Sequence, residues 1–465
     1  MASDVRRQRS GRRCHFLWKF GWFLWIVLHC LDVPAQEMIS PQPPVSPDSD
    51  ERPLFSSEQL ELGGHLKTRL AVNDPASGSI YHAMESGAAW DNQDELRLKG
   101  RYNFRDVAEL EVHNESFLVW SETQGVLSEL YEGQGGGSGD VLTPQLLIND
   151  RRRLMNLTWT WEEGKKLYAV NRFDRLSLTL FPSWGVVKAG RQAISWGNGM
   201  LFNPFDIFAP FAPTTLDRDY KQGEDALSVQ WTPGDPYGDL QLIYIPRRNI
   251  VTRDVSWAES SVAANYHFPI PGSEWELSLM GACHYEDFPV GAGVVGYMGG
   301  SALRLNTTWT HLKKEDSGFL SLVANVDYGW VWWGLNFYGW VEYYYNGLGE
   351  PRGRYAEALK NEALRERLLR GELYVRGRHY VDAQVRVELH PLVNFQIVAI
   401  TNIVDPSGVI QPYLIWDLHD NLRLNLSASL YWGGRGTEYG GVDIGRTGLT
   451  DRPSNNLIMW LAFYF

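Results

Sequence analysis

The chain has 465 residues, of which 44% are apolar, 21% charged and 13% aromatic, and its mean hydropathy is −0.29. Aromatic side chains at this density exclude a disordered chain, and 3 cysteines in this length exclude a disulfide scaffold. The formal net charge of −12 argues against a nucleic-acid partner. After residue 36 the longest run without a charge has 16 residues, Phe288–Leu303, whereas a membrane-spanning helix needs roughly 18 to 20 apolar residues. A bundle of membrane-spanning helices is therefore also excluded.

The first 35 residues have the features of a secretory signal peptide. Five arginines precede the apolar stretch Phe16–Leu31, and the triplet Val33-Pro34-Ala35 follows it with small residues near a cleavage position. An N-terminal anchor helix is the alternative. The next segment, residues 36–58, begins with a Pro- and Ser-rich stretch, which predicts a flexible periplasmic lead-in.

The remainder, residues 59–465, contains segments of about ten residues in which apolar and polar side chains alternate. Five such segments are Glu95–Phe104, Trp275–Tyr285, Leu303–His311, Tyr380–Leu389 and Leu422–Trp432. Because successive side chains of a strand point to opposite faces, each segment has one apolar and one polar face. The pattern predicts an all-β protein.

Either a soluble sandwich or barrel with its apolar face inside, or a membrane barrel with that face outside, satisfies this alternation. The strands are about as long as the 9–11 residues that a tilted membrane strand needs. Aromatic residues gather near strand ends, as around Trp330–Trp333 and Tyr343–Tyr345, which is typical of interfacial girdles. The sequence therefore predicts a transmembrane antiparallel up-and-down β-barrel. We expect about 16 strands, with 14 and 18 as alternatives, because single-chain bacterial barrels have even strand numbers.

The last ten residues alternate apolar side chains from Leu457 to a terminal Phe465. This ending resembles the C-terminal signal of Gram-negative outer-membrane proteins. A second segment, Gly190-Arg191-Gln192 followed by Ser195–Gly199, Phe202-Asn203-Pro204 and Asp206, resembles a stretch of porin-like barrels from proteobacteria. These resemblances imply secretion to the Gram-negative outer membrane, contact with its lipid, and recognition by the barrel-assembly machinery through the strand that ends at Phe465.

Turn residues suggest where the strands are connected. Asp420-Asn421 and His390-Pro391 are expected to form periplasmic turns, and Gly433–Ser454 and Gly349–Gly377 to form outer loops. The second outer loop contains Tyr355–Arg370, whose Ala, Leu, Glu and Arg content favours one short helix that caps the barrel mouth or meets a partner. Counting back from Phe465 by turns puts the Gly-rich segment 121–150 in the periplasm, although its composition suits an outer loop. This conflict indicates a miscounted strand between residues 160 and 300.

The segment Trp196–Asp225 is expected to be a long apolar loop, in which three prolines oppose regular structure. Such a loop should pack or bind, so we expect it to enter the lumen or to cross the mouth, with packing on the outer rim as the alternative. The candidate residues of a constriction are Lys188, Arg191, Asp206, Asp217, Arg218, Asp219, Lys221, Glu224 and Asp225. Their basic members could attract anionic solutes, but pairing with the neighbouring carboxylates in a structural network is the interpretation we favour.

The polar strand faces provide the candidates for the lumen. The residues expected to face it are Arg97, Lys99, Arg101, Glu276, His284, Arg304, Asp382, Arg386, Glu388 and Arg423. They mix both charge signs, which predicts a weak ionic preference. The motifs of nucleophilic, phosphate-binding or metal-dependent catalysis are missing after residue 35, so no enzyme, metal or cofactor is expected.

The predicted function is passive diffusion of small hydrophilic solutes through a porin-like channel narrowed by loop 196–225. The alternative is a sleeve or export conduit for a multihaem cytochrome or a polysaccharide, which should have a wide lumen without an inward plug. A homotrimer is an open alternative for the assembly.

Overall fold

The computed structural model describes residues 54–84, 87–105, 107–123, 149–234, 237–444 and 448–465. Within them, 18 antiparallel strands form a closed ring in which each strand pairs with its neighbours along the chain. The strands of the ring are β2 (Leu60–Asp74), β3 (Ala89–Phe104), β4 (Ala108–Ser121), β6 (Leu167–Leu180), β7 (Gly185–Gln192), β8 (Glu224–Trp231), β9 (Asp239–Ile245), β10 (Ser261–Pro269), β11 (Trp275–His284), β12 (Phe288–Met298), β13 (Ser301–Leu312), β14 (Ser317–Trp332), β15 (Leu335–Asn346), β16 (His379–His390), β17 (Val393–Asn402), β18 (Ser407–His419), β19 (Leu422–Trp432) and β22 (Asn455–Tyr464).

The predicted fold class is confirmed, but the favoured number of 16 strands is wrong, because the ring has 18. The strands β7, β8 and β9 have only 8, 8 and 7 residues, too few for a clear alternation. They lie in the part of the chain where the turn count failed. With 18 strands, the connection from β4 to β6 lies at the same end of the barrel as the other long connections. Most of its Gly-rich segment, residues 124–148, lies outside the described residues.

The ring closes where β22 pairs with both β19 and β2. At the end of this seam, Gly64 and Phe465 exchange two backbone hydrogen bonds of 2.7 and 2.9 Å. A Cβ atom on Gly64 would lie 2.1 Å from the carbonyl oxygen of Arg97, so only glycine fits here. The last strand is therefore needed to leave no open edge in the barrel.

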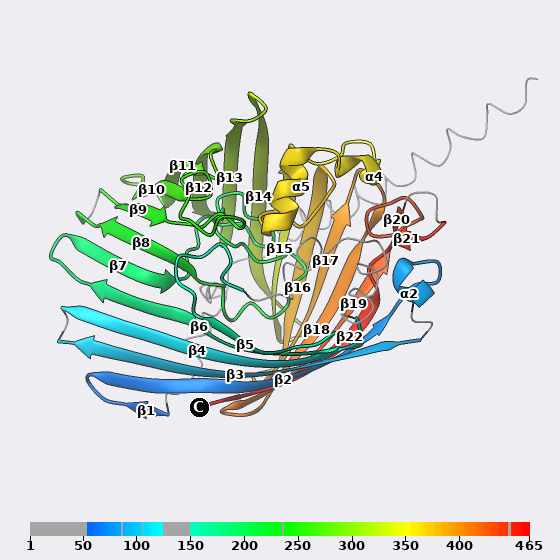
Figure 1. Ribbon diagram of the computed structural model, residues 1–465, viewed down its shortest axis with the longest axis horizontal. Helices are drawn as coiled ribbons and strands as arrows, with labels where there is room; N and C mark the ends of the chain where they lie inside the picture. The colour runs from blue at the N-terminus through cyan, green and yellow to red at the C-terminus, as the bar shows by residue number, and fades with distance from the viewer. Residues whose placement is uncertain (1–53, 85–86, 106, 124–148, 235–236, 445–447) are drawn as a thin grey trace, which may run out of the picture. The chain divides into compact units, whose positions relative to one another are not determined.

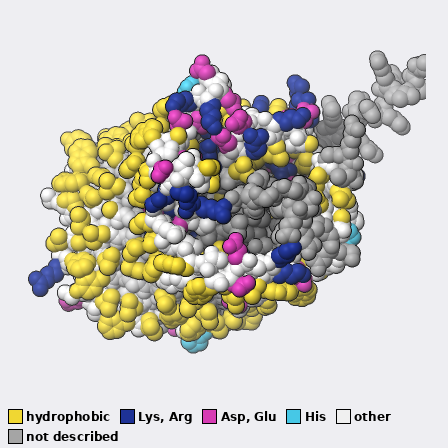
Figure 2. All heavy atoms as spheres, in the orientation of Figure 1, with side chains coloured by type: hydrophobic (Ala, Val, Ile, Leu, Met, Phe, Trp, Pro, Cys, Tyr) yellow, Lys and Arg dark blue, Asp and Glu magenta, His cyan; other side chains and the backbone are white. Residues whose placement is uncertain are grey.

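The alternation of side chains sorts the two faces of the wall. Large apolar side chains such as Leu66, Leu118, Leu178 and Leu242 are 44–51% exposed and cover the outside. Figure 2 shows hydrophobic side chains over the wall formed by β2–β8, while charged side chains gather at the rim. The inward faces are largely buried and carry polar and charged side chains together with apolar ones such as Ile243, Met280 and Val398. This is the pattern of a barrel that spans a membrane.

Connections at one end of the barrel are short, and those at the other end include all the long ones (Figure 1). The pairs Asp420-Asn421 and His390-Pro391 lie at the short-turn end, while Gly349–Gly377 and Gly433–Ser454 lie at the long-loop end. Of the additional strands, β1 (Phe55–Ser56) pairs with β2 and β5 (Thr158–Glu163) with β6, and β20 (Val442–Asp443) pairs with β21 (Thr450–Asp451) in a long connection.

The described residues contain three helices instead of the single one expected. These are α2 (Ile80–Met84), α4 (Tyr355–Ala358) and α5 (Glu362–Arg370). The predicted helix Tyr355–Arg370 is divided because Asn361 starts a new helix: its side chain accepts a hydrogen bond of 3.0 Å from the backbone N–H of Leu364. Gly371 ends α5 in the left-handed conformation. None of the helices in the described residues is long and apolar enough to cross a bilayer.

The apolar core lies inside the barrel, between the wall and the long connections. One cluster joins Trp196, Phe205 and Phe208 to inward side chains of β8–β11. A second joins Phe202 to side chains of β14–β18. The proposed signal peptide and most of the lead-in lie outside the described residues.

Candidate functional site in the barrel interior

The segment between β7 and β8, residues 193–223, runs inside the ring of strands (Figure 1). It contains no helix or strand, in keeping with its three prolines, which lack the backbone donors of regular structure. Its apolar side chains pack on inward-facing residues of opposite parts of the wall. The alternative position on the outer rim is therefore wrong. Glu224 and Asp225 belong to β8 and not to this segment, which we call the inner loop.

A single carboxylate on the wall holds the beginning of the inner loop. Glu342, on β15, accepts backbone hydrogen bonds from Met200, Leu201 and Phe202 at 2.6, 3.0 and 2.9 Å. Asn325 of β14 donates a fourth bond of 3.1 Å. Three consecutive N–H groups pointing at one buried oxygen pair form an anion nest, which fixes the local path of the backbone.

The end of the inner loop is fixed by Arg218 and by a lysine of β2. The Arg218 guanidinium donates to the carbonyls of Thr215, Met200 and Pro213 at 3.1, 2.9 and 3.2 Å, so it ties the loop to itself. Lys67 pairs with Asp217 at 3.1 Å and with Asp219 at 2.5 Å. The inner loop therefore spans the interior from β15 to β2.

The wall from β2 to β8 carries a dense set of ion pairs, which fall into several separate groups. We call it the ion network: His65, Lys67, Glu95, Arg97, Glu111, Glu115, Arg172, Asp174, Arg175, Lys188, Arg191 and Asp225. Its pairs include Arg191–Asp225 at 2.8 Å, Lys188–Glu111 at 2.6 Å and Arg172–Glu115 at 2.5 Å. Side chains of opposite charge lie within hydrogen-bond distance of one another, so this part of the wall has no large patch of a single charge sign.

The ring of Tyr220 joins the inner loop to the ion network. The guanidinium carbon of Arg97 lies 3.8 Å from the centre of this ring, and the imidazole of His65 stacks on it at 5.5 Å. Lys99 donates to the Tyr220 hydroxyl at 3.1 Å. A cation packed on the face of an aromatic ring is attracted to it, and this attraction is stronger when the cation and the ring are removed from bulk water.

Asp206 and Lys221 form an ion pair inside the inner loop. Burial raises the pKa of Asp206 to about 6, although Lys221 opposes the shift. Burial also lowers the pKa of Lys221. Both shifts have the same cause, because a poorly hydrated site disfavours each charge. Asp206 can therefore change its charge near neutral pH.

The structure brings together some of the sequence-predicted constriction residues. Asp206, Asp217, Arg218, Asp219 and Lys221 lie in the inner loop. The others lie on the wall: Lys188 and Arg191 on β7, and Glu224 and Asp225 on β8. Arg191 is fully buried by its carboxylate partners and by carbonyl groups, so it has no surface left for a solute.

The residues expected to face the lumen lie on the strand faces opposite to the exposed apolar side chains. Several are engaged: Arg304 pairs with Asp327 at 2.9 Å, Arg423 with Asp417 at 2.6 Å, and the Arg101 guanidinium with Glu61 at 3.3 Å. Glu276 pairs with His267, Glu388 accepts from Asn336, and Arg386 lies over the ring of Tyr338. Asp382 is buried opposite Glu342, and neither of its carboxylate oxygens has a hydrogen-bond partner in the described part of the chain.

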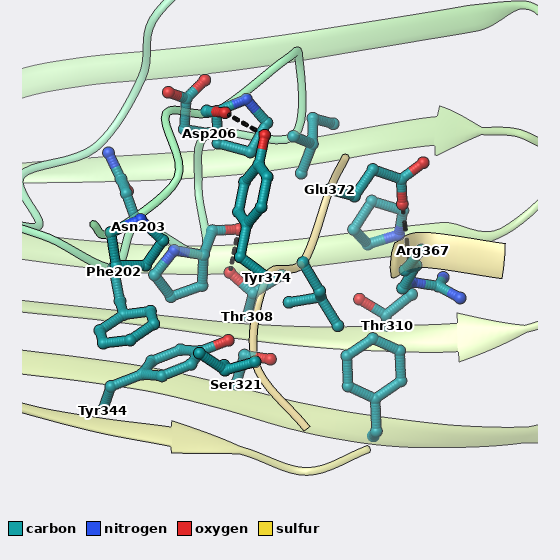
Figure 3. Close-up of a pocket in the computed structure, with 18 of the residues that line it drawn as sticks. Phe202, Asn203, Asp206, Thr308, Thr310, Ser321, Tyr344, Arg367, Glu372 and Tyr374 are labelled. Carbon is teal, nitrogen blue, oxygen red and sulfur yellow. Dashed lines mark hydrogen bonds and ion pairs between the residues drawn. The ribbon is translucent and has the colours of Figure 1, made fainter. Parts of the chain in front are cut away.

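A cavity of about 90 Å³ lies between the inner loop, the inner face of β11–β15 and the segment after α5. Figure 3 shows Tyr374 across its middle, with Phe202 and Tyr344 on one side and Arg367 and Glu372 on the other. The Tyr374 hydroxyl donates to the carbonyl of Pro210 at 2.9 Å, which connects this segment to the inner loop.

Comparison with known proteins supports the fold. No family model and no curated protein matches the chain. Among solved structures, OccK9 (OpdG) of Pseudomonas aeruginosa matches with a TM-score of 0.50 and 9% identity, over 88% of this chain and 98% of that one. A BenF-like porin of Pseudomonas fluorescens Pf-5 matches at 0.48 and 10%, over 88% and 99%. OccAB2 of Acinetobacter baumannii matches at 0.48 and 11%, over 87% and 98%. This likeness is one of fold.

Sequence reasoning missed three residues that organise the site. Glu342 and Lys67 lie on strands whose charges look like any others of a polar strand face, and only the path of the inner loop shows what they hold. Tyr374 follows α5 in a connection without a pattern. Among the described residues, no group of three or more His, Cys, Asp or Glu side chains could hold a metal ion.

Proposed function

We propose that the protein is an outer-membrane channel for passive diffusion of small hydrophilic solutes, and that the inner loop narrows its lumen. The observation that carries the proposal is the path of the inner loop from β15 to β2 across the interior of a closed barrel. An apolar outer wall suits lipid, and a polar interior suits water. Selectivity in such a pore depends on its width and on its wall charges.

The charges support a channel with a weak ionic preference. The cations of the ion network and of the inner loop, apart from Arg218, are paired with carboxylates, so the lumen presents little net charge. No catalytic role follows from these pairs. The proposed location is the outer membrane of a Gram-negative bacterium, which the fold and the terminal strand both support.

The alternative of a sleeve for a cytochrome or a polysaccharide is less well supported. A sleeve needs an open lumen, whereas here the inner loop crosses the interior and is fixed at both of its ends.

The proposal is tested by conductance measurements on the purified protein in planar bilayers. We expect discrete steps of current in KCl. Small polyethylene glycols should enter the pore and lower its conductance, whereas polymers above a sharp size limit should be excluded and leave the conductance unchanged. That size limit measures the width of the constriction. Insertion without any current would contradict the proposal. A conductance that is also lowered by large polymers would show that the protein is a channel without a constriction.

A further inference from the structure

The cavity beside Tyr374 has a lining whose charges cancel. Each of its three carboxylates has a cationic partner. Arg367 of α5 lies 2.7 Å from Asp287 and 3.7 Å from Glu372. Arg370 lies 3.5 Å and His284 3.3 Å from Glu372, and the Asp206 carboxylate pairs with Lys221. A charged solute would have to break one of these pairs, which leaves a buried charge without compensation and costs more than the new pair returns.

The pKa of Glu372 shows how completely this side of the cavity is compensated. Burial acts to raise this pKa, but His284, Arg370 and Arg367 outweigh it and lower the pKa to about 2. Glu372 therefore keeps its charge and its partners throughout the physiological range. Asp206, whose pKa is raised by burial, lies across Tyr374 from Glu372 (Figure 3).

Hydroxyl groups, aromatic rings and aliphatic side chains provide most of the rest of the lining. Thr308 and Thr310 of β13 and Ser321 of β14 point inward from neighbouring strands and are 3–7% exposed. Thr308 donates to the carbonyl of Pro204 at 3.3 Å. The hydroxyl of Thr310 has no hydrogen-bond partner within the described ranges, so it can bind a ligand. The rings of Phe202 and Tyr344 stack with their centres 4.3 Å apart and form an apolar side.

We infer that this cavity binds a small neutral polyol on its way through the barrel, an inference that rests on the proposed channel function. Hydroxyl groups of the solute would bond to the threonine and serine hydroxyls, and its C–H groups would pack on the aromatic rings. This combination of an apolar lining with a few polar groups is typical of ligand sites. The cavity volume of about 90 Å³ admits only a short solute, so the test uses chains of no more than four carbons.

The test compares two four-carbon solutes, neutral erythritol and the anion erythronate. Uptake into proteoliposomes is measured against empty liposomes, and binding is measured by saturation-transfer NMR of the protein in nanodiscs. We expect saturable uptake and binding of erythritol, and several-fold weaker uptake and binding of erythronate. Equal uptake of the two solutes without saturation would overturn the inference.

Matched variants locate the binding. Thr310→Val removes the inward hydroxyl and keeps the shape of the side chain, while Thr307→Val makes the same change on the opposite face of β13. The first should raise the half-saturating erythritol concentration roughly three- to ten-fold, as expected for one hydrogen bond, and the second should leave it unchanged. Equal effects of both variants would contradict the site.

A charge variant tests the compensation separately. Arg367→Gln leaves Asp287 without its cation, so we expect the preference to move from erythritol toward a protonated amino-polyol of the same length. An unchanged preference would show that the pairing of charges in the cavity lining does not determine which solute is bound. KCl conductance of the same samples separates the two proposals: current without polyol binding defeats only this inference, and polyol binding without current defeats only the channel.

Discussion

At the scale of single residues, most charged side chains in the interior of this barrel are paired with a side chain of opposite charge. Glu342 differs from the others because it accepts hydrogen bonds from three consecutive backbone N–H groups of the inner loop. A carboxylate that accepts several backbone bonds can be replaced only at a large cost, because the donors are then left unpaired in a buried place. This residue therefore decides where the loop begins its path across the lumen.

Replacing Glu342 should loosen the inner loop. For Glu342→Ala we expect larger and noisier single-channel currents, and a loss of roughly 2–4 kcal/mol of folding free energy from the unpaired donors. Currents are recorded in planar bilayers, and stability is measured by denaturant unfolding. The control is Glu388→Ala on β16, since among the described residues Glu388 accepts a hydrogen bond only from Asn336. Quiet currents of unchanged size in the Glu342 variant would mean that this nest does not position the loop.

Asp206 should make the channel sensitive to pH. Because its pKa is about 6, the carboxyl becomes neutral as the pH falls from 7 to 5, which leaves the charge of Lys221 uncompensated. The ratio of chloride to potassium permeability should therefore rise over this range, and reversal potentials measure it. Asp206→Asn should show the raised ratio already at pH 7, without the pH step. A step that persists in this variant would assign the titration to another group.

The same shift has a defined effect on stability. A raised pKa in the folded protein means that folding favours the protonated acid, so the contribution of Asp206 to stability is fully present below its unfolded pKa and is lost as the pH rises through about 6. In Asp206→Asn this part of the pH dependence of unfolding should disappear.

At the scale of elements, the inner loop behaves as an additional layer that the wall holds at two places. Its apolar residues were visible in the sequence as a stretch too apolar for a solvated connection, and this predicted that it packs. The contacts that hold it could not be predicted. Lys67 pairs with Asp217, which lies 150 positions further along the chain. A local sequence pattern cannot predict a contact over such a separation.

Cutting the second attachment should free the C-terminal part of the inner loop. In Lys67→Met, Asp217 and Asp219 lose their shared cation, so we expect the channel to flicker between two current levels. The matched control is Lys188→Met, whose partner Glu111 belongs to the wall. Single-channel recordings at low salt show the difference, because salt screens exposed charges. Identical traces for the two variants would remove Lys67 from the attachment.

Long strands with clear alternation, such as β3 and β19, could be identified from the sequence because their pattern is local. The shortest strands of the ring could not be identified in this way. β7 is interrupted by Gly190, whose φ of 123° suits only glycine, and β9 has too few residues for several alternations. The start of α5 depends on the N-cap at Asn361, which cannot be recognised from the composition of the segment Tyr355–Arg370.

At the scale of the whole molecule, a narrowed channel requires two linked properties of the barrel. The apolar side chains face outward, and the polar interior is divided by the inner loop. The first property follows from alternation and was predictable. The number of strands, and hence the space that the loop divides, depends on how many short strands join the ring. The pairings of β7, β8 and β9 with their neighbours bring that number to 18, and the pairing of β22 with β2 closes the ring.

The most direct test of a channel narrowed by its inner loop is the single-channel conductance in KCl of a variant in which residues 197–222 are replaced by a short Gly-Ser linker. Heat-modified migration of both proteins on gels checks that each barrel is folded. We expect the variant to conduct several-fold more current than the unchanged protein and to admit larger polymers. A folded variant with the same conductance and the same size limit would show that the inner loop does not narrow the channel.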